Sequence, residues 1–479
     1  IFLFSSEGVI MDITVFDVGF GQSILMEEDG DQLLVDCGSR DSKYGATISC
    51  IRDKLQQPDT LRRVALLTHY HKDHYSFFSK LGNQPFDGFY LPFVAFHKKK
   101  SKETGKETGK ETSKEESKEA SEMECTLAEE AMLGYILEAS CKIDADMLLC
   151  NQIKKLLELV KDSGWVAVPR RGDVFHLGRT KCEVLWPDIP QGVDSLRHEH
   201  KRREQIQHIK SILNDYIENH ELFNQTWDNI IKNLYDFYCS ISDITDFSGE
   251  DVNDFGQIRH RNIEERHYPI LRERLQSILA KQTENMEKLN GISNTFWESF
   301  KGEGNQATLR SLKSSISRIF NHDNNAVSIV FQDLIEEEYI SNRSHRFLMT
   351  GDITKKIIEK KLFTHESRRI YDVIQCPHHG TKSHFSASLP YGKQLIISNK
   401  KYLNYGSVSF LYGCYYPALA GRKCMKCIGK YVWICNGKYP HFPVKHFCTN
   451  ADAKTCESLQ HGQPCPGCVS HQPSGTITV

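Results

Sequence analysis

The sequence predicts a layered α/β sandwich. Short apolar stretches with strand character alternate with helical stretches, and several predicted strands end directly in Asp or His residues. The chain has 479 residues, of which 39% are hydrophobic, and this suffices for one large core with accessory segments. The formal net charge of −2 excludes a whole-molecule attraction to nucleic acid or acidic lipid.

The N-terminal part contains turn signals between apolar runs. Gly19-Phe20-Gly21 and Asp29-Gly30-Asp31 each separate two apolar stretches and indicate tight turns. A helix is expected from about residue 42 to 57, because Pro58 ends it. The predicted strands are 13–16, 23–26, 33–35 and 64–67, of which the third ends at Asp36 and the fourth leads into His69.

The character of the chain then changes several times. Residues 98–119 are near-repeats of Lys-Glu-Thr-Gly, a composition that forms no core and predicts a solvated loop. Residues 195–317 are polar with weak 3.6-residue apolar spacing, which predicts a helical insertion. A helix is expected over 124–161, and strands over 181–186, 326–331 and 347–349. The predicted divisions are 1–194 and 318–412 for the two parts of the sandwich, 195–317 for the insertion and 413–479 for a Cys-rich tail.

The sequence also predicts where the protein resides. No stretch approaches the ~18 continuous apolar residues that cross a bilayer. The opening Ile1-Phe2-Leu3-Phe4 run is too short for a signal peptide and lacks a basic flank. Eight cysteines lie between Cys414 and Cys468, two pairs of them as Cys-x-x-Cys, which indicates metal binding in a reducing compartment. We therefore expect a cytoplasmic protein without membrane contacts.

The segment from Thr68 to His74 is the most informative one. A buried strand runs into His-x-His-x-Asp-His, so that His69 and His71 can bind one metal ion while Asp73 and His74 bind a second. Imidazole suits zinc, manganese or iron, and the carboxylate favours a harder second site. The alternative is a surface histidine cluster without a metal. The match at four fixed positions after a buried strand favours the metal site.

Two later segments complete this set. Asp352 ends a predicted strand and could bridge both metals, and the Pro377-His378-His379-Gly380 turn follows another strand. Asp36, at the end of its own strand, is expected to hold the histidine loop by hydrogen bonds without touching metal. Each of these residues is a weak indicator alone, because a strand-end Asp is usually a turn residue.

The order of these motifs resembles the metallo-β-lactamase superfamily, and more narrowly the soluble hydrolase domain of ComEC-type proteins. Asp17-Val18-Gly19-Phe20-Gly21, Asn325 with Ser328, and His378-His379-Gly380 are similar to motifs of that group. The resemblance covers 12–190 and 320–400, without the transmembrane part of ComEC. It implies an αββα sandwich, here with the helical insertion and the Cys-rich zinc-binding tail.

The resemblance also implies roles for individual residues. Asp73, Asp352 and His378 would be catalytic, with His378 contacting a substrate phosphate. The superfamily's further histidine has no clear equivalent; His176 and His322 are candidates, and Asn325 could occupy that region instead. The two ions would be Zn²⁺ or Mn²⁺, sharing a hydroxide that attacks phosphorus in line. The ligands implied are His69, His71, Asp73, His74, Asp352 and His379, with Asp36, Asn325 and Ser328 as supporting motif residues.

The tail has the composition of a zinc-binding segment. Cys424-x2-Cys427 and Cys465-x2-Cys468 are 37 residues apart, so one or two structural zinc ions are expected. The pairing of ligands stays open. The expected zinc ligands are Cys424, Cys427, Cys435, Cys448, Cys456, Cys465 and Cys468.

The basic residues of the chain gather near this tail. Between Val373 and Ala451 there is no Asp or Glu, while ten Lys or Arg and many aromatics occur. Basic residues bind phosphates and aromatic faces stack bases, whereas the alternative is a small aromatic core with solvated lysines. The lysines expected to bind nucleic acid are Lys382, Lys393, Lys423, Lys426 and Lys430.

Together these features predict a metal-dependent phosphodiesterase that acts as a nuclease, on DNA rather than RNA. One alternative is a hydrolase of a small phosphodiester. Another is a metal-stabilised scaffold that recruits a protein partner through the 195–317 insertion. The ComEC-type resemblance further implies a role in antiviral defence beside partner proteins.

Overall fold

A computed structural model describes residues 10–40, 44–92, 163–187 and 325–398, apart from 17, 83–85, 336–344 and 364–369. It also describes residues 97–98, 123–124, 445–448 and 474–478, and parts of 221–291. The predicted helix 124–161, except Glu124, lies outside these residues, as do Asp17, the loop 99–119 and all the expected zinc ligands except Cys448.

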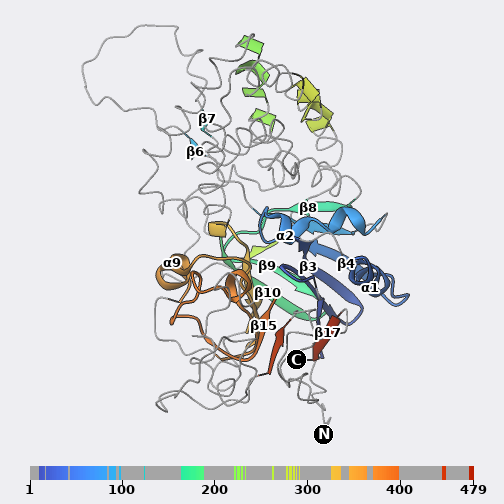
Figure 1. Ribbon diagram of the computed structural model, residues 1–479, viewed down its shortest axis with the longest axis vertical. Coiled ribbons are helices and arrows are strands. Elements are labelled where there is room, and N and C mark those ends of the chain that lie inside the picture. Colours follow the sequence, from blue (N-terminus) through green and yellow to red (C-terminus); the bar gives the residue numbers. More distant parts are fainter. Residues whose placement is uncertain are drawn as a thin grey trace, which may run out of the picture.

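The first sheet has seven strands in the order β17-β1-β2-β3-β4-β5-β8 (Figure 1). The pairs from β17 to β3 are antiparallel, and the pairs from β3 to β8 are parallel. This confirms the four strands predicted in the N-terminal part. The strands are β1 (Asp12–Phe16), β2 (Gly21–Glu28), β3 (Asp31–Ser39), β4 (Arg62–Leu66), β5 (Gly88–Tyr90), β8 (Trp165–Ala167) and β17 (Ser474–Thr478).

The second sheet has eight strands in the order β11-β9-β10-β12-β13-β14-β15-β16. Its strands are β9 (Asp173–Leu177), β10 (Thr180–Trp186), β11 (Arg261–Asn262), β12 (Val330–Asp333), β13 (His345–Met349), β14 (Ile370–Gln375), β15 (Tyr391–Ile397) and β16 (Lys445–Cys448). A separate pair, β6 (His97–Lys98) and β7 (Met123–Glu124), brackets the predicted low-complexity loop.

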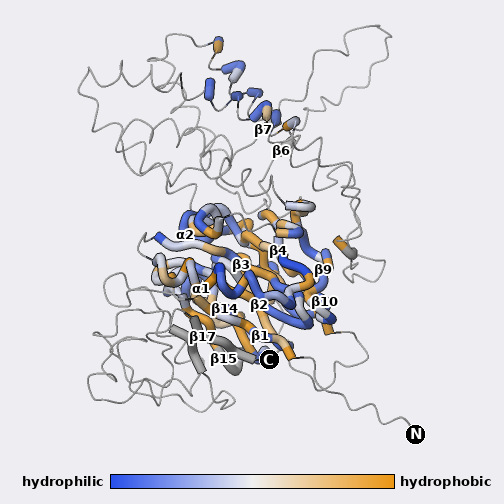
Figure 2. Tube along the Cα trace, turned by 90° about the vertical axis from the view of Figure 1, so that its right-hand side faces the viewer, coloured by the Kyte–Doolittle hydropathy of each residue, from blue (hydrophilic) through white to orange (hydrophobic). Residues whose placement is uncertain are grey.

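The two sheets face each other across the main hydrophobic core. Ile24, Val35 and Leu66 of the first sheet belong to the same buried cluster as Phe331 and Phe347 of the second. Figure 2 shows hydrophobic segments in orange within the strands of both sheets, alternating with hydrophilic segments in blue. This burial is the main source of folding free energy and sets the sheets at a fixed separation.

Helices cover the outer faces. The first sheet carries α1 (Gly45–Leu55), whose Ile48, Ile51 and Leu55 are buried, and the helix predicted over 42–57 is thereby confirmed. On the second sheet, α9 (Lys355–Ile357) and the single π-turn η7 (Ile358–Leu362) bury Ile357 and Ile358 against a second cluster. The layered α/β class predicted from the sequence is therefore confirmed.

One strand prediction is wrong for four of its six residues. The apolar run 326–331 was expected to be a strand throughout, but β12 begins only at Val330. Asn325 and Ala326 are instead helical and Val327 lies in a turn. The Ser328 amide donates to the Asn325 carbonyl (3.2 Å), and the Trp186 indole donates to the Ala326 carbonyl (2.7 Å). These bonds outweigh the strand propensity of the run.

The sheets include parts of the chain that were expected to lie outside them. β11 comes from the predicted insertion, and β16 and β17 come from the predicted tail. The helical insertion and the zinc-binding tail themselves stay predictions. Within the described part of the chain, no helix is long and apolar enough to span a membrane.

Candidate metal centre

The histidine loop begins where β4 ends. Its chain leaves the sheet at Leu66 and passes through His69 before the short helix α2 (Lys72–Tyr75) begins. His71 is the N-cap, with an extended backbone (φ −99°, ψ 146°), and its carbonyl accepts a hydrogen bond from the amide of His74 (2.9 Å). The motif is therefore split between an extended segment and the first turn of a helix. His69, His71, Asp73 and His74 are all buried.

Asp36 holds this loop from below. It is the extra residue of a β-bulge, because Ser23 pairs with Cys37 and Ile24 pairs with Val35, and its φ is +56°. Such bulges redirect a side chain. One Asp36 oxygen accepts from the Thr68 amide (2.7 Å), and the other lies 2.8 Å from Nδ1 of His74.

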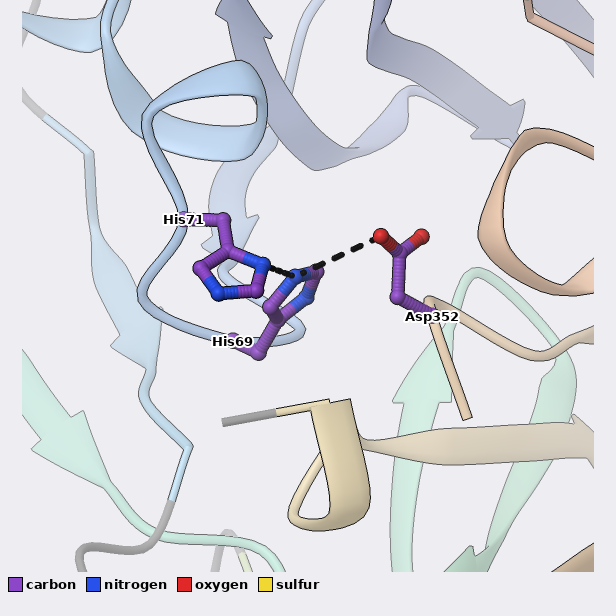
Figure 3. A group of neighbouring side chains, drawn as sticks. All are labelled: His69, His71 and Asp352. Carbon is purple, nitrogen blue, oxygen red and sulfur yellow. Dashed lines mark hydrogen bonds and ion pairs between the residues drawn. The ribbon is translucent and has the colours of Figure 1, made fainter. Parts of the chain in front are cut away.

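Asp352 comes from the second sheet. It follows β13 after Gly351, whose φ is +52°, and its amide donates to the Ser328 hydroxyl (3.2 Å). Figure 3 shows its carboxylate directed toward His69. Its Oδ2 lies 3.3 Å from Nε2 of His74 and 3.6 Å from Nε2 of His69.

The His378-His379 turn, α10 (Pro377–Gly380), completes the site. Both histidines have positive φ (47° and 57°), which directs consecutive imidazoles toward the same carboxylates. Nε2 of His379 lies 3.4 Å from Asp73 and 3.7 Å from Asp352. Nε2 of His378 lies 3.5 Å from Asp352, and this side chain is 19% exposed, so it is in contact with solvent while the other histidines of the site are buried.

A buried glutamine pair connects the two halves. Nε2 of Gln375 donates to Oε1 of Gln22 (2.7 Å), and Nε2 of Gln22 donates to Asp36 (3.1 Å). Oε1 of Gln375 accepts from the amides of Thr350 (2.8 Å) and Gly351 (2.7 Å). The histidine loop and the Asp352 turn are thus connected through one continuous chain of hydrogen bonds.

Replacing Gln375 with alanine is expected to destabilise the protein by roughly 1–3 kcal/mol, because two buried amides lose their acceptor. Urea denaturation measures this loss. The control is Gln57→Ala, since Gln57 is exposed and makes one long bond to the Asp53 carbonyl (3.4 Å). Equal stability of the two variants would show that the glutamine pair does not support the site.

The six predicted ligands form two groups. His69, His71 and Asp352 make up one, and Asp73, His74 and His379 make up the other; within each group the ligand atoms lie within 4.8 Å of one another. Both Asp352 oxygens are buried, and no described residue donates a hydrogen bond of regular geometry to them, although imidazole nitrogens lie as close as 3.3 Å. A desolvated carboxylate in this position fits a ligand of divalent metal ions.

The protonation states suit metal binding. Burial lowers the pKa of His69 well below its ordinary value and that of His71 to about 4, so both imidazoles are neutral at neutral pH. Burial alone would raise the pKa of Asp352, but the imidazoles of His74, His379 and His378 outweigh it and keep that pKa well below its usual range. Asp352 is therefore ionised and can bind a cation.

His74 differs from the other histidines. Burial disfavours its charged form, but the carboxylates of Asp352 and Asp36 outweigh burial and raise its pKa well above the ordinary value. Without a metal, His74 therefore carries a proton at neutral pH. Its Nε2 must lose that proton before it can bind a cation, so metal affinity is expected to increase with pH.

The further histidine expected at the first group is not found among the described residues. His176 lies on β9, where its carbonyl accepts a hydrogen bond from Arg62, and it belongs to neither ligand group. His322 is outside the described residues. Asn325 is buried, and its Oδ1 has no hydrogen-bond partner among the described residues. Four residues later, the Ile329 amide donates to the Thr68 carbonyl (3.0 Å) of the histidine loop.

The structure adds residues that the sequence analysis did not assign. Gln22 and Gln375 are polar residues inside buried strands, and this pattern could have identified them. Arg40 pairs with Asp73, 33 residues away, and no local pattern predicts such a contact. Lys382 is exposed in the turn after His379, the side chain of Lys393 is not described, and the other three predicted lysines lie outside the described residues.

Comparison with known proteins agrees with this geometry. Residues 16–85 match the family model described as the metallo-beta-lactamase superfamily. The match includes Asp36 and the complete His-x-His-x-Asp-His loop, and it ends before the second sheet begins. No curated protein matches the chain. The family match and the two ligand groups together indicate a metal-dependent hydrolase.

Proposed function

We propose that the protein is a metal-dependent phosphodiesterase that cleaves nucleic acid, with DNA as the favoured substrate. The supporting observation is the buried Asp352 carboxylate, which lies 3.3 to 3.7 Å from four imidazole nitrogens and joins ligands from both sheets. When bound, a pair of divalent cations such as Zn²⁺ or Mn²⁺ would activate water and neutralise charge on phosphoryl oxygens.

The protein's own residues would position the substrate. His378 is part-exposed at the edge of the ligand groups, and burial lowers its pKa to about 4, so that it is neutral at neutral pH. Its Nδ1 lies 2.8 Å from the Thr381 hydroxyl, which fixes the orientation of the ring. A neutral Nε2–H would donate a hydrogen bond to a phosphate oxygen.

The charge distribution favours a polyanionic substrate. Lys382 is exposed four residues beyond His378, within the acid-free stretch from Val373 to Ala451. Neutralising several phosphates would supply binding free energy and make the affinity depend on salt concentration. The proposal includes a Cys-rich tail that binds structural zinc and a ComEC-type hydrolase domain, both as predicted from the sequence.

The test is cleavage of linear, circular and single-stranded DNA and of RNA by the full chain with Zn²⁺, Mn²⁺ or Mg²⁺. Asp73→Ala is expected to lower the cleavage rate by about 10²–10³-fold or more, since a metal ligand is lost. The matched control is Asp53→Ala, because Asp53 is an exposed aspartate on α1.

Two outcomes would contradict the proposal. Cleavage that persists in Asp73→Ala would show that the activity does not come from this site. Hydrolysis of bis(p-nitrophenyl) phosphate without cleavage of any nucleic acid would indicate an enzyme for small phosphodiesters.

A further inference from the structure

Arg40 lies at the edge of the metal centre, directly after β3. Its backbone amide donates to the carbonyl of Phe20 (2.9 Å), which joins the end of β3 to the turn before β2. Its Nε lies 3.0 Å from Oδ2 of Asp73. The two partners differ in exposure, since the Arg40 side chain is 51% exposed and that of Asp73 only 2%. Arg40 therefore connects a buried metal ligand to the solvent.

A second contact fixes the plane of the guanidinium. Its central carbon lies 4.3 Å from the centroid of the Phe20 ring, a cation–π arrangement. The Phe20 ring in turn lies 4.7 Å from the ring of His379. The guanidinium is thus held at one edge by Asp73 and on one face by an aromatic ring that contacts another predicted ligand.

This arrangement leaves donors available for a ligand. A guanidinium carries five N–H groups in a flat fork, and the Asp73 contact occupies the Nε edge. Within the described residues, Asp73 is the one carboxylate that pairs with Arg40. A half-exposed ion pair contributes little to stability, so supporting Asp73 alone is a weak reason to place an arginine here.

We infer that Arg40 is a substrate-binding residue that holds a phosphate-class oxyanion beside the two ligand groups, an inference that rests on the proposed phosphodiesterase function. Arginine binds phosphate through parallel N–H donors, which a lysine cannot reproduce. The three carboxylates of Asp36, Asp73 and Asp352 carry at most three negative charges, which the four positive charges of two divalent cations would exceed, so the occupied site would also attract anions. The N–H donors of Arg40 would then orient a bound phosphate by directional hydrogen bonds.

The experiment measures binding of inorganic phosphate by calorimetry to the full chain loaded with Zn²⁺, with zinc content determined in parallel. Arg40→Gln removes the charge but keeps an amide that can still contact Asp73, and Arg40→Lys keeps the charge without the fork. The matched control is Arg179→Gln, because Arg179 makes the same Nε contact to Asp29 (2.8 Å) at the opposite end of β2.

We expect the Kd for phosphate to rise about tenfold or more in Arg40→Gln and less in Arg40→Lys, with zinc content unchanged. Arg179→Gln should bind phosphate like the wild type. For bis(p-nitrophenyl) phosphate, Arg40→Gln should raise KM more than it lowers kcat.

Three outcomes would overturn the inference: no phosphate binding by the wild type, equal phosphate binding by Arg40→Gln and the wild type, or loss of zinc from Arg40→Gln. The last would make Arg40 a positioning residue for Asp73. A failure of the proposed function is distinguishable, because Arg40-dependent phosphate binding without cleavage of any phosphodiester would leave this inference standing.

Discussion

Asp352→Asn is expected to lower metal-dependent hydrolysis by about 10³-fold or more, because the proposed site then lacks the carboxylate shared by both halves. Asparagine retains the shape of the side chain and the Asp352 amide still donates to Ser328. The fold is therefore expected to persist. The measurements are hydrolysis of bis(p-nitrophenyl) phosphate and metal content per chain, both of which should decrease.

A spectroscopic measurement distinguishes loss of the Asp352 carboxylate from unfolding of the variant. Asp352 is one of two carboxylates that raise the pKa of His74, so the pKa of His74 in the metal-free protein should fall in Asp352→Asn. NMR titration of the His74 ring detects this change. Asp53→Asn is the control and should alter none of the three measurements. An Asp352→Asn protein that retains metal and activity would contradict the two-group site.

Gly38→Ala is expected to distort the histidine loop. A Cβ at Gly38 would lie 2.6 Å from the backbone nitrogens of His74 and Tyr75 and 2.7 Å from the carbonyl carbon of Asp73. These are backbone atoms, so no side chain can rotate away and either β3 or α2 must move. Overpacking of this kind costs roughly 1–3 kcal/mol. Because α2 carries Asp73 and His74, metal affinity should fall as well.

Gly45→Ala is the matched control, since a Cβ at Gly45 meets nothing within 4 Å and the residue begins α1. Alanine there should leave stability unchanged or raise it by up to about 1 kcal/mol. Urea denaturation and competition with a chelator measure the two effects. If Gly38→Ala matches Gly45→Ala in both, the close approach of β3 to α2 does not determine the geometry of the loop.

The sequence was most informative where the chemistry is local. The run from His69 to His74 could be recognised because its ligands are neighbours in the chain and follow an apolar strand. Asp352 and His379 were weak candidates as residues that follow predicted strands, and the order of motifs in a known family strengthened them, since nothing local shows that two strand ends meet. The early strands and α1 were predictable because turn residues bound them.

Other features depend on contacts that no local pattern encodes. Gln22 and Gln375 form a hydrogen bond across 353 positions, and Arg40 reaches Asp73 only because β3 and α2 lie together. Residues 326–329 were expected to belong to a strand, because the hydrogen bond from the Trp186 indole to the Ala326 carbonyl cannot be inferred from the sequence. The bulge at Asp36 likewise arises from the register in which β2 and β3 pair, which the sequence of β3 alone does not show.

The pairing of β1 with β17 has a consequence for synthesis of the chain. Phe16 lies opposite Ser474, so more than four hundred residues must be translated before the two strands can meet. At ~5–20 residues per second, the nascent chain presents the unpaired edge of β1 for on the order of half a minute or longer. An uncovered strand edge invites pairing with other chains. On a polysome, several nascent chains expose this edge close to one another and can aggregate. The yield of folded protein should therefore depend on chaperones that bind the nascent chain.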